Sequence, residues 1–386
     1  MAEYVCNTPV AVIIFRRPRQ TARVMEAVRA VRPRQLFIVA DGPRADRPGE
    51  AEACEEARRI ATLVDWDCEC RTNFAPSNMG LRRRMASGIS WVYEQVDRAI
   101  LLEDDCLPHP TFFRFCEELL EHYLHDERVM MVSGDNAHGF TDAYSYYFTR
   151  YALIWGWATW RRAWAHFDIE MSRWPALADT DWLRDVLGDN QAENFWYDWY
   201  QRNYEGFNSW ATPWMLSCWQ NGGLSANAAV NAISNIGFGD DATHTIGSGE
   251  GELRSAAPLT PISFPLRHPP GVLRNAVADD FVEQTVFSGR YGASQSIQFK
   301  ESPARMLQRA SLMSIYGQSR QALAILDQAS AVLPDSPGVR YGRALMHSRL
   351  GEPAQARRIL SERLPDTGHD PVSAALIAAL STGIDL

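Results

Sequence analysis

The chain has 386 residues, of which 46% are hydrophobic and 22% charged, so it is long enough for two folded domains of ordinary globular composition. Its formal net charge of −9 argues against a protein whose main task is to coat nucleic acid or an anionic membrane, and we expect no nucleic-acid partner. No run of residues approaches the ~20 apolar residues of a transmembrane helix, so we expect no transmembrane segment.

From residue 9 to about residue 136, short apolar runs alternate with amphipathic stretches, which predicts a parallel α/β sheet with crossover helices. The expected strands are Val10–Phe15, Leu36–Ala40, Asp67–Arg71, Ala99–Glu103 and Val129–Ser133. The expected helices are Thr21–Val31, Gly49–Leu63, Gly80–Val96 and Pro110–His125. Ligands of such sheets bind beyond the carboxyl ends of the strands, so polar residues at those ends are the first candidates for a site.

Residues 140–244 are rich in aromatic motifs, including Trp155, Trp157, Trp160 and Trp164. Such side chains serve both in cores and in sugar-binding clefts, and for any single tryptophan we favour core packing. A stretch rich in Gly, Ser and Pro, residues 247–270, then predicts a long surface loop. We expect the first domain, the catalytic one, to cover residues 1–291.

The last ninety residues repeat with a period of 34, which separates Gly317 from Gly351. The same offset relates Ala322 to Ala356, Ile325 to Ile359, Leu326 to Leu360 and Pro337 to Pro371. This period is similar to that of the tetratricopeptide repeat, a helix pair that stacks on its neighbours. We therefore expect an all-α repeat domain over residues 301–386. Two repeats cannot bury their own faces, so the domain should dock on the catalytic domain or on a protein partner.

The seven cysteines show no paired CxxC spacing, so neither a zinc site nor a disulfide framework is indicated. Reduced thiols are typical of a cytoplasmic protein. The first apolar run follows MAEYVCNTP, is short and has no preceding basic region, which favours a strand over a signal peptide. Together these features predict a cytoplasmic location.

The strongest chemical signal is an apolar strand that ends in three carboxylates, Glu103, Asp104 and Asp105. Three like charges at the end of a buried strand are costly unless a cation shares them. Hard oxygen ligands suit small divalent ions, so we expect Mn²⁺ or Mg²⁺ as a cofactor. The alternative is a solvated turn, or an N-cap for the helix expected from Pro110.

The segment EDDCLPHPTFFRFC resembles the part of Golgi N-acetylglucosaminyltransferase I in which acidic residues and a following helix hold the metal and the nucleotide sugar. VIIFRRP resembles the first strand of that family and of bacterial family-2-like glycosyltransferases. VADGPR resembles the end of the second strand, and ISNIGFGDDATHT resembles the loop that closes over the donor. The resemblance spans residues 9 to about 290. It implies a GT-A fold, which is a Rossmann-like nucleotide-diphospho-sugar transferase domain, and an inverting glycosyltransferase that uses a UDP-sugar.

Carried onto this sequence, the resemblance assigns binding roles to residues at strand ends. The nucleotide-sugar donor would be contacted by Phe15, Arg17, Asp41, Glu103 and Asp104. Asp105 would ligate the metal directly, and His244 matches a histidine that some GT-A enzymes place at the metal or the diphosphate.

The residues between Asn78 and Arg84 add a further candidate. Departure of a nucleoside diphosphate builds negative charge on the leaving phosphate, which a divalent ion and arginines can stabilise. A helix that begins near Gly80 would supply its N-terminus and several guanidinium groups. We therefore nominate Asn78 and Arg82 as residues on the phosphate side of the donor.

An inverting transfer also needs a general base to take a proton from the acceptor hydroxyl. FWYDW, residues 195–199, resembles the acidic, aromatic segment that supplies the base, which nominates Asp198. A second alignment puts NSWATPW, residues 208–214, in that place, with Ala211 where bacterial relatives carry an acid. In that register Asp198 or Glu205 acts after a rearrangement, the acceptor is already nucleophilic, or the enzyme is impaired.

The acceptor is left open between a glycan, a lipid-linked sugar and a protein side chain. Two other functional classes compete with a transferase. A sugar-nucleotide pyrophosphorylase carries a glycine-rich phosphate loop after its first strand, and FRRPRQT lacks those glycines. A binding protein that recruits a partner through the repeats, and has lost turnover, is favoured by Ala211.

Overall fold

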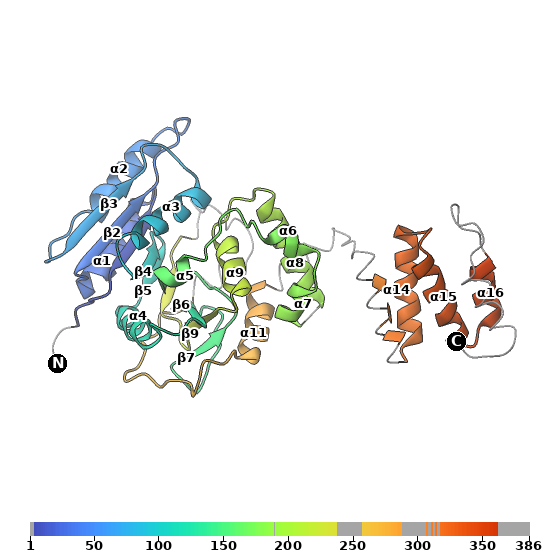
Figure 1. Cartoon of the computed structure of the whole chain (residues 1–386). Coiled ribbons are helices and arrows are strands. Elements are labelled where there is room, and N and C mark those ends of the chain that lie inside the picture. Colours follow the sequence, from blue (N-terminus) through green and yellow to red (C-terminus); the bar gives the residue numbers. More distant parts are fainter. Residues whose placement is uncertain are drawn as a thin grey trace. The chain divides into compact units, whose positions relative to one another are not determined.

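The computed structural model describes residues 4–188, 190–237, 257–287 and 317–361, together with short pieces at 306–307, 310–311 and 313–314. The chain divides into two compact units, Met1–Ser296 and Ile297–Leu386 (Figure 1). Each unit has its own hydrophobic core. Among the described residues, no helix is both long and apolar enough to cross a membrane.

Within its described residues, the first unit is built on an eight-stranded mixed sheet with the strand order β3-β2-β1-β4-β8-β6-β9-β7. The strands are β1 (Val10–Ile14), β2 (Gln35–Ala40), β3 (Glu69–Phe74), β4 (Arg98–Glu103), β6 (Val129–Ser133), β7 (Tyr146–Thr149), β8 (Trp157–Trp160) and β9 (Leu224–Ala228). Strand β8 runs antiparallel to β4 and β6, and β7 runs antiparallel to β9, while the other strands share one direction. A separate two-stranded sheet pairs β5 (Cys106–Pro108) with β10 (Ile233–Asn235).

All five strands expected from the sequence are present, and the parallel arrangement holds for β3, β2, β1 and β4. The fifth expected strand, β6, runs in the same direction, but β8 inserts antiparallel between β4 and β6 and makes the sheet mixed. All four residues of β8, Trp157–Trp160, are buried, which suits a strand in the middle of a sheet. The sequence pattern of this aromatic run does not predict a strand.

Helices cover both faces of the sheet. Among the described residues of the first unit, the helices are α1 (Pro18–Val31), α2 (Glu50–Ala61), α3 (Leu81–Tyr93), α4 (Pro110–His122), α5 (Arg161–Trp164), α6 (Trp174–Ala178), α7 (Trp182–Leu187), α8 (Asn190–Tyr204), α9 (Ala211–Gln220) and α11 (Ala276–Val282). Helices α1, α2 and α4 share one core cluster with Val10 and Val12 of β1. Helices α3, α5, α8 and α9 share the other cluster with Ala11 and Ile13. The alternation along β1 therefore sends successive side chains to opposite layers.

The tryptophans of the aromatic region lie mainly in the core. Fully or almost fully buried are Trp157, Trp160, Trp164, Trp174, Trp196, Trp210, Trp214 and Trp219. Trp157 stacks on Trp210 with ring centroids 5.6 Å apart, and Trp164 contacts Trp214 at 5.1 Å. The prediction that a given tryptophan packs in the core is confirmed for these residues. Trp155 is half-buried.

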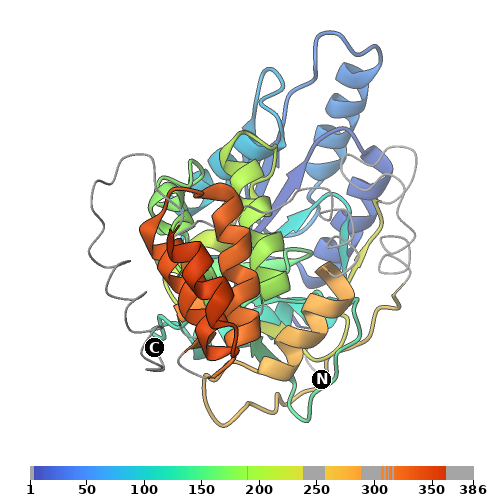
Figure 2. The same cartoon turned by 90° about the vertical axis from the view of Figure 1, so that its right-hand side faces the viewer.

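The second unit contains α14 (Ser319–Val332), α15 (Pro337–Arg349) and α16 (Pro353–Ser361), which lie side by side in Figure 2. Gly317 and Gly351, one period apart, precede α14 and α16 with φ angles of 73° and 78°. Only glycine adopts this left-handed backbone without strain, which explains the glycine in each repeat. Ala322 and Ala356 are both fully buried, so these equivalent positions of the two repeats are equally shielded from water.

A buried charge cluster fixes α11 and the π-helix that follows it, Glu283–Phe287, to strand β7. Thr149 of β7 donates a hydrogen bond to Asp279 at 2.5 Å, and Arg150 lies 3.8 Å from Asp279 and 3.9 Å from Glu283. Trp196 of α8 donates its indole N–H to Glu283 at 3.3 Å. Burial raises the pKa of Glu283 to about 7, although Arg150 opposes the shift.

We predict that Glu283→Gln changes the pH dependence of stability. Because the folded protein holds the Glu283 proton more tightly than the unfolded chain, stability contributed by this group falls as the pH rises from 4.5 to about 7. The fall is on the order of 3 kcal/mol, and glutamine, which does not titrate, removes it. Urea unfolding of both proteins between pH 5 and 8 measures the difference. The control is Asp280→Asn, which changes an exposed carboxylate on the neighbouring helix α11. Parallel stability curves for the wild type and Glu283→Gln would contradict the prediction.

Candidate active site

Strands are added to the sheet on both sides of β1. From β1 it proceeds to β2 and β3 on one side, and it then returns to place β4 on the other side of β1. The residues that follow β1 and β4 are therefore neighbours at the carboxyl edge, which is the edge where open α/β sheets bind ligands. The register pairs Ile13 with Glu103, so the residues that follow each strand meet at this edge.

A compact ion pair lies at this point. The backbone N–H of Phe15 donates to Asp104 Oδ2 at 3.0 Å. Arg17 places Nη1 2.7 Å from Asp105 Oδ2 and 3.5 Å from Asp104 Oδ1. Arg17 is the N-cap of α1, and Pro18 begins the helix, so the guanidinium projects from a fixed backbone. The structure thus brings together four of the predicted site residues, Phe15, Arg17, Asp104 and Asp105.

The carboxylates at the end of β4 are electrostatically strained. Burial raises the pKa of Asp104, the neighbouring charge of Asp105 adds to the rise, and Arg17 opposes it. The pKa of Glu103 is also raised, first by burial and then by Asp105 and Asp104. A raised pKa means that the ionised form is costly here, so further positive charge at this edge is favoured.

Asp105 is enclosed by the strand pair β5 and β10. Its carbonyl accepts a hydrogen bond from the N–H of Ile236 at 2.8 Å. A Cβ atom on Gly237 would lie 2.2 Å from Asp105 Oδ2, so only glycine leaves the carboxylate in place. The start of the segment ISNIGFGDDATHT is therefore packed against the acidic residues. Its His244 lies outside the described residues.

Asp41 at the end of β2 is a hub of hydrogen bonds. Oδ1 accepts from the N–H groups of Gly42 and Met79, both at 2.8 Å, and Oδ2 accepts from the N–H of Gly80 and from Asn78 Nδ2, both at 3.1 Å. Four bonds fill the acceptor capacity of a carboxylate. Asp41 and Asn78 therefore lie together, and in this structure the Asp41 carboxylate holds the turn that leads into α3.

Arg82, in the first turn of α3, is bound away from the strand ends. Its N–H donates to Asn208 Oδ1 at 3.0 Å, and its guanidinium donates to the carbonyl oxygens of Asn203, at 3.1 Å, and Ile169. Arg82 thus ties α3 to the turn between α8 and α9. The structure does not bring the Arg82 guanidinium together with the Arg17 cluster.

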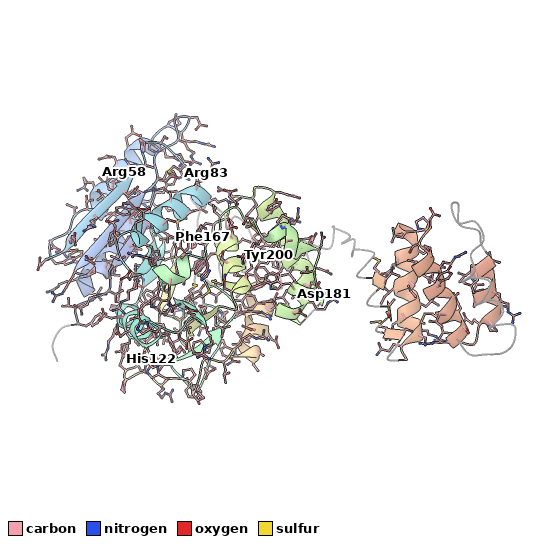
Figure 3. All side chains as sticks on the ribbon, in the orientation of Figure 1. Arg58, Arg83, His122, Phe167, Asp181 and Tyr200 are labelled. Atoms are coloured by element: carbon pink, nitrogen blue, oxygen red, sulfur yellow. The ribbon has the colours of Figure 1, made fainter. Side chains whose placement is uncertain are left out.

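The candidate bases lie on or beside α8. Asp198 is half-buried on this helix, which packs on α6, α7 and α9. The Arg58 guanidinium donates a hydrogen bond to the carbonyl oxygen of Asp41, so Arg58 marks the end of β2. In Figure 3, Tyr200 of helix α8 lies away from Arg58. Glu205 is exposed and accepts a hydrogen bond from Gln201 at 2.7 Å. Ala211 is the first residue of α9, so no carboxylate extends from that helix start.

Trp155 is one of the aromatic residues for which the sequence leaves a sugar-binding role open. It precedes β8, whose first residue, Trp157, pairs with Leu101 of β4. Gly156, with φ of 61°, makes the turn between Trp155 and Trp157, and a side chain there would collide with Ile233. A half-buried indole can stack on a ring of a ligand. The motif WGW, a glycine between two tryptophans, is the sequence feature that marks this turn.

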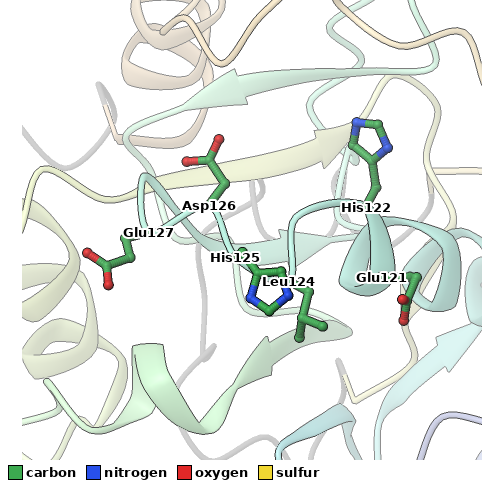
Figure 4. Close-up of a pocket in the computed structure, with 6 residues that line it drawn as sticks. All are labelled: Glu121, His122, Leu124, His125, Asp126 and Glu127. Carbon is green, nitrogen blue, oxygen red and sulfur yellow. The ribbon is translucent and has the colours of Figure 1, made fainter.

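A separate hollow lies elsewhere on this unit (Figure 4). It is lined by Glu121, His122, Leu124, His125, Asp126 and Glu127. These residues end α4 and lead into β6, so the hollow is at the amino edge of the sheet, opposite the acidic triplet. With one apolar lining residue, it lacks the apolar walls of a typical ligand pocket.

Comparisons with known proteins bear mainly on the second unit. Residues 316–380 match the tetratricopeptide repeat family, which confirms the repeat predicted from the 34-residue period. No curated protein matches the sequence. Among solved structures, the crystal structure of a UDP-glucose pyrophosphorylase complexed with UDP-glucose matches with a TM-score of 0.21 and 11% identity. That match covers 38% of this chain and 64% of the pyrophosphorylase chain, and so low a TM-score does not establish a shared fold.

We predict that Asp41→Ala loosens the turn before α3. The N–H groups of Met79 and Gly80 lose their acceptor, so their amide hydrogens should exchange faster and the unit should lose about 2–4 kcal/mol of stability. Glu117→Ala is the matched control, because Glu117 accepts the N–H groups of Asn7 and Thr8 outside the site. Hydrogen exchange followed by mass spectrometry measures the effect. Unchanged exchange at residues 79 and 80 would contradict the role of Asp41.

Proposed function

We propose that the chain is a metal-dependent, inverting glycosyltransferase of the GT-A fold, which moves a sugar from a UDP-sugar to a glycan, lipid-linked or protein acceptor. The observation that carries this proposal is the cluster of Arg17, Asp104 and Asp105 at the carboxyl ends of β1 and β4. Nucleotides bind at this edge in open α/β sheets. The order of the resembling segments along the chain supports the transferase class.

The residues at the end of β4 suit a metal that is shared with a substrate. Among the described residues, no three His, Cys, Asp or Glu side chains converge on one point, so there is no ready-made protein cage. Mg²⁺ and similar ions are commonly held by one or two carboxylates together with substrate phosphates and water. Asp105, whose side chain is 16% exposed, fits this kind of ligand. Such an ion would neutralise charge on the departing diphosphate.

Different residues of the protein would then contact different parts of the nucleotide sugar. Arg17 would face the phosphates, and Phe15 and the turn held by Asp41 would border the nucleoside. Glu103 and Asp104 would contact the sugar. Asn78 orders the turn beside Asp41. Asp198 takes the proton from the acceptor hydroxyl only if α8 or the acceptor approaches the strand ends, since its helix packs on α6, α7 and α9.

Ala211 favours a second candidate function, a glycosyltransferase-like binding protein that has lost turnover. The residue opens α9 with a methyl group, where an acid is expected in bacterial relatives. The helical repeats would then recruit a protein partner, as repeats of this kind provide extended binding surfaces. Binding of the donor without transfer to any acceptor would distinguish this function from the first.

The first test concerns Asp105. In the full-length protein, Asp105→Asn should remove the Mn²⁺-dependent part of UDP binding, because the neutral amide is a poor ligand for a hard cation. Isothermal titration calorimetry with and without Mn²⁺ measures it. Asp65→Asn, which breaks an exposed pair with Arg29, is the control. An affinity for UDP that still rises with Mn²⁺ in Asp105→Asn would remove Asp105 as a ligand.

The second test concerns the general base. Asp198→Asn should keep UDP and Mn²⁺ affinity but slow transfer to the acceptor by roughly 10²- to 10⁴-fold, the usual worth of a positioned proton transfer. Release of UDP from a panel of UDP-sugars, with candidate acceptors present, measures the rate. Glu205→Gln serves as the comparison. Normal transfer by Asp198→Asn together with slow transfer by Glu205→Gln would move the role to Glu205.

A further inference from the structure

Arg17 occupies the place where a metal would be expected. Its guanidinium lies 2.7 Å from Asp105 Oδ2, which is the carboxylate proposed as the direct metal ligand. The two side chains are only 13% and 16% exposed, so water screens the pair weakly. The protein thus supplies its own counter-cation to the acidic triplet.

A divalent cation and Arg17 compete for the same oxygen. Two cations within a few ångströms of each other repel, and a single carboxylate oxygen at this depth cannot compensate both. A metal that binds Asp105 Oδ2 therefore has to displace the guanidinium. A free metal ion must do so unaided, whereas a nucleoside diphosphate offers the displaced guanidinium new anionic oxygens.

The surroundings allow Arg17 to leave Asp105 without leaving the site. Asp104 is held by the N–H of Phe15 at 3.0 Å and lies 3.5 Å from the Arg17 guanidinium, so it remains as a partner. Gly237 lies close against Asp105, because a Cβ atom there would be 2.2 Å from Asp105 Oδ2, so the side chain that moves in the exchange is Arg17 and not Asp105. The exchange changes one contact of Arg17 and keeps the helix start at Pro18 in place.

We propose that Arg17 is an exchangeable counter-cation, which occupies Asp105 in the empty protein and passes to the diphosphate oxygens when a nucleoside diphosphate and a divalent cation bind together. This inference rests on the proposed function. It makes metal and nucleotide binding mutually dependent. The metal alone binds weakly, because the Arg17 guanidinium occupies Asp105, and the diphosphate draws that guanidinium away. Arg17 acts here as a positioning residue for the metal and as a ligand for the phosphates.

The test uses full-length protein and two separate titrations. In the first, Mn²⁺ alone is titrated into wild type and Arg17→Gln, and free Mn²⁺ is followed by electron paramagnetic resonance. We expect roughly tenfold tighter Mn²⁺ binding by the variant, within the usual range of coupling between two sites. In the second, UDP is titrated at saturating Mn²⁺, and the variant should bind UDP roughly 10- to 100-fold more weakly.

Two further variants keep the test interpretable. Arg16→Gln is the matched control, because Arg16 is the neighbouring arginine and pairs with Glu50 at 3.5 Å instead of the acidic triplet. It should change neither titration. Arg17→Lys retains a positive charge and should give Mn²⁺ affinity between wild type and Arg17→Gln, which also guards against a folding defect. Circular dichroism verifies that each variant is folded.

The outcomes separate this inference from the proposed function. Mn²⁺ affinity that is unchanged or weaker in folded Arg17→Gln overturns the exchange. Tighter Mn²⁺ binding with unchanged UDP affinity overturns the transfer of Arg17 to the phosphates. Wild-type protein that binds no nucleoside diphosphate with Mn²⁺ overturns the proposed function itself, whatever the Mn²⁺ titration gives.

Discussion

The first unit depends on a single electrostatic constraint, which is that three consecutive carboxylates end a buried strand. Strand β4 is covered on both faces, so Glu103, Asp104 and Asp105 cannot turn away from one another into bulk water without disrupting the sheet. Their charge has to be balanced at the carboxyl edge. Arg17 supplies part of the balance, and the N–H of Phe15 supplies another part. The negative charge that Arg17 and Phe15 leave unbalanced favours the binding of a cation at this edge.

The fold makes this balance possible by bringing distant segments to one edge. The chain reverses its direction across the sheet at β1, which places the start of α1 beside the end of β4. The pairing of β5 with β10 then folds Ile236 and Gly237 back onto Asp105. A phosphate-bearing ligand with a divalent cation would complete the charge balance, whereas a neutral ligand would leave it unchanged.

The sequence predicted the features that depend on local patterns. Buried, β-branched runs located β1, β2 and β4 to within one or two residues, and the 34-residue period located equivalent buried positions such as Ala322 and Ala356. It did not predict that β8 is inserted antiparallel, or that Arg82 is bound to the carbonyl groups of Asn203 and Ile169. These contacts join residues far apart in the chain, and no spacing rule encodes them. The four hydrogen bonds to Asp41 were hidden for the same reason, since three of their donors belong to residues 78–80.

The central claim is that a nucleoside diphosphate and a divalent cation meet at the carboxyl ends of β1 and β4. A crystal structure of the full-length protein with UDP and Mn²⁺, with data collected at an X-ray energy that reveals manganese, tests this claim most directly. We predict an anomalous peak within direct coordination distance of the Asp105 carboxylate, about 2.0–2.3 Å, with the UDP phosphates as further ligands. A peak at the hollow beside His122, or UDP bound away from both strand ends, would contradict it.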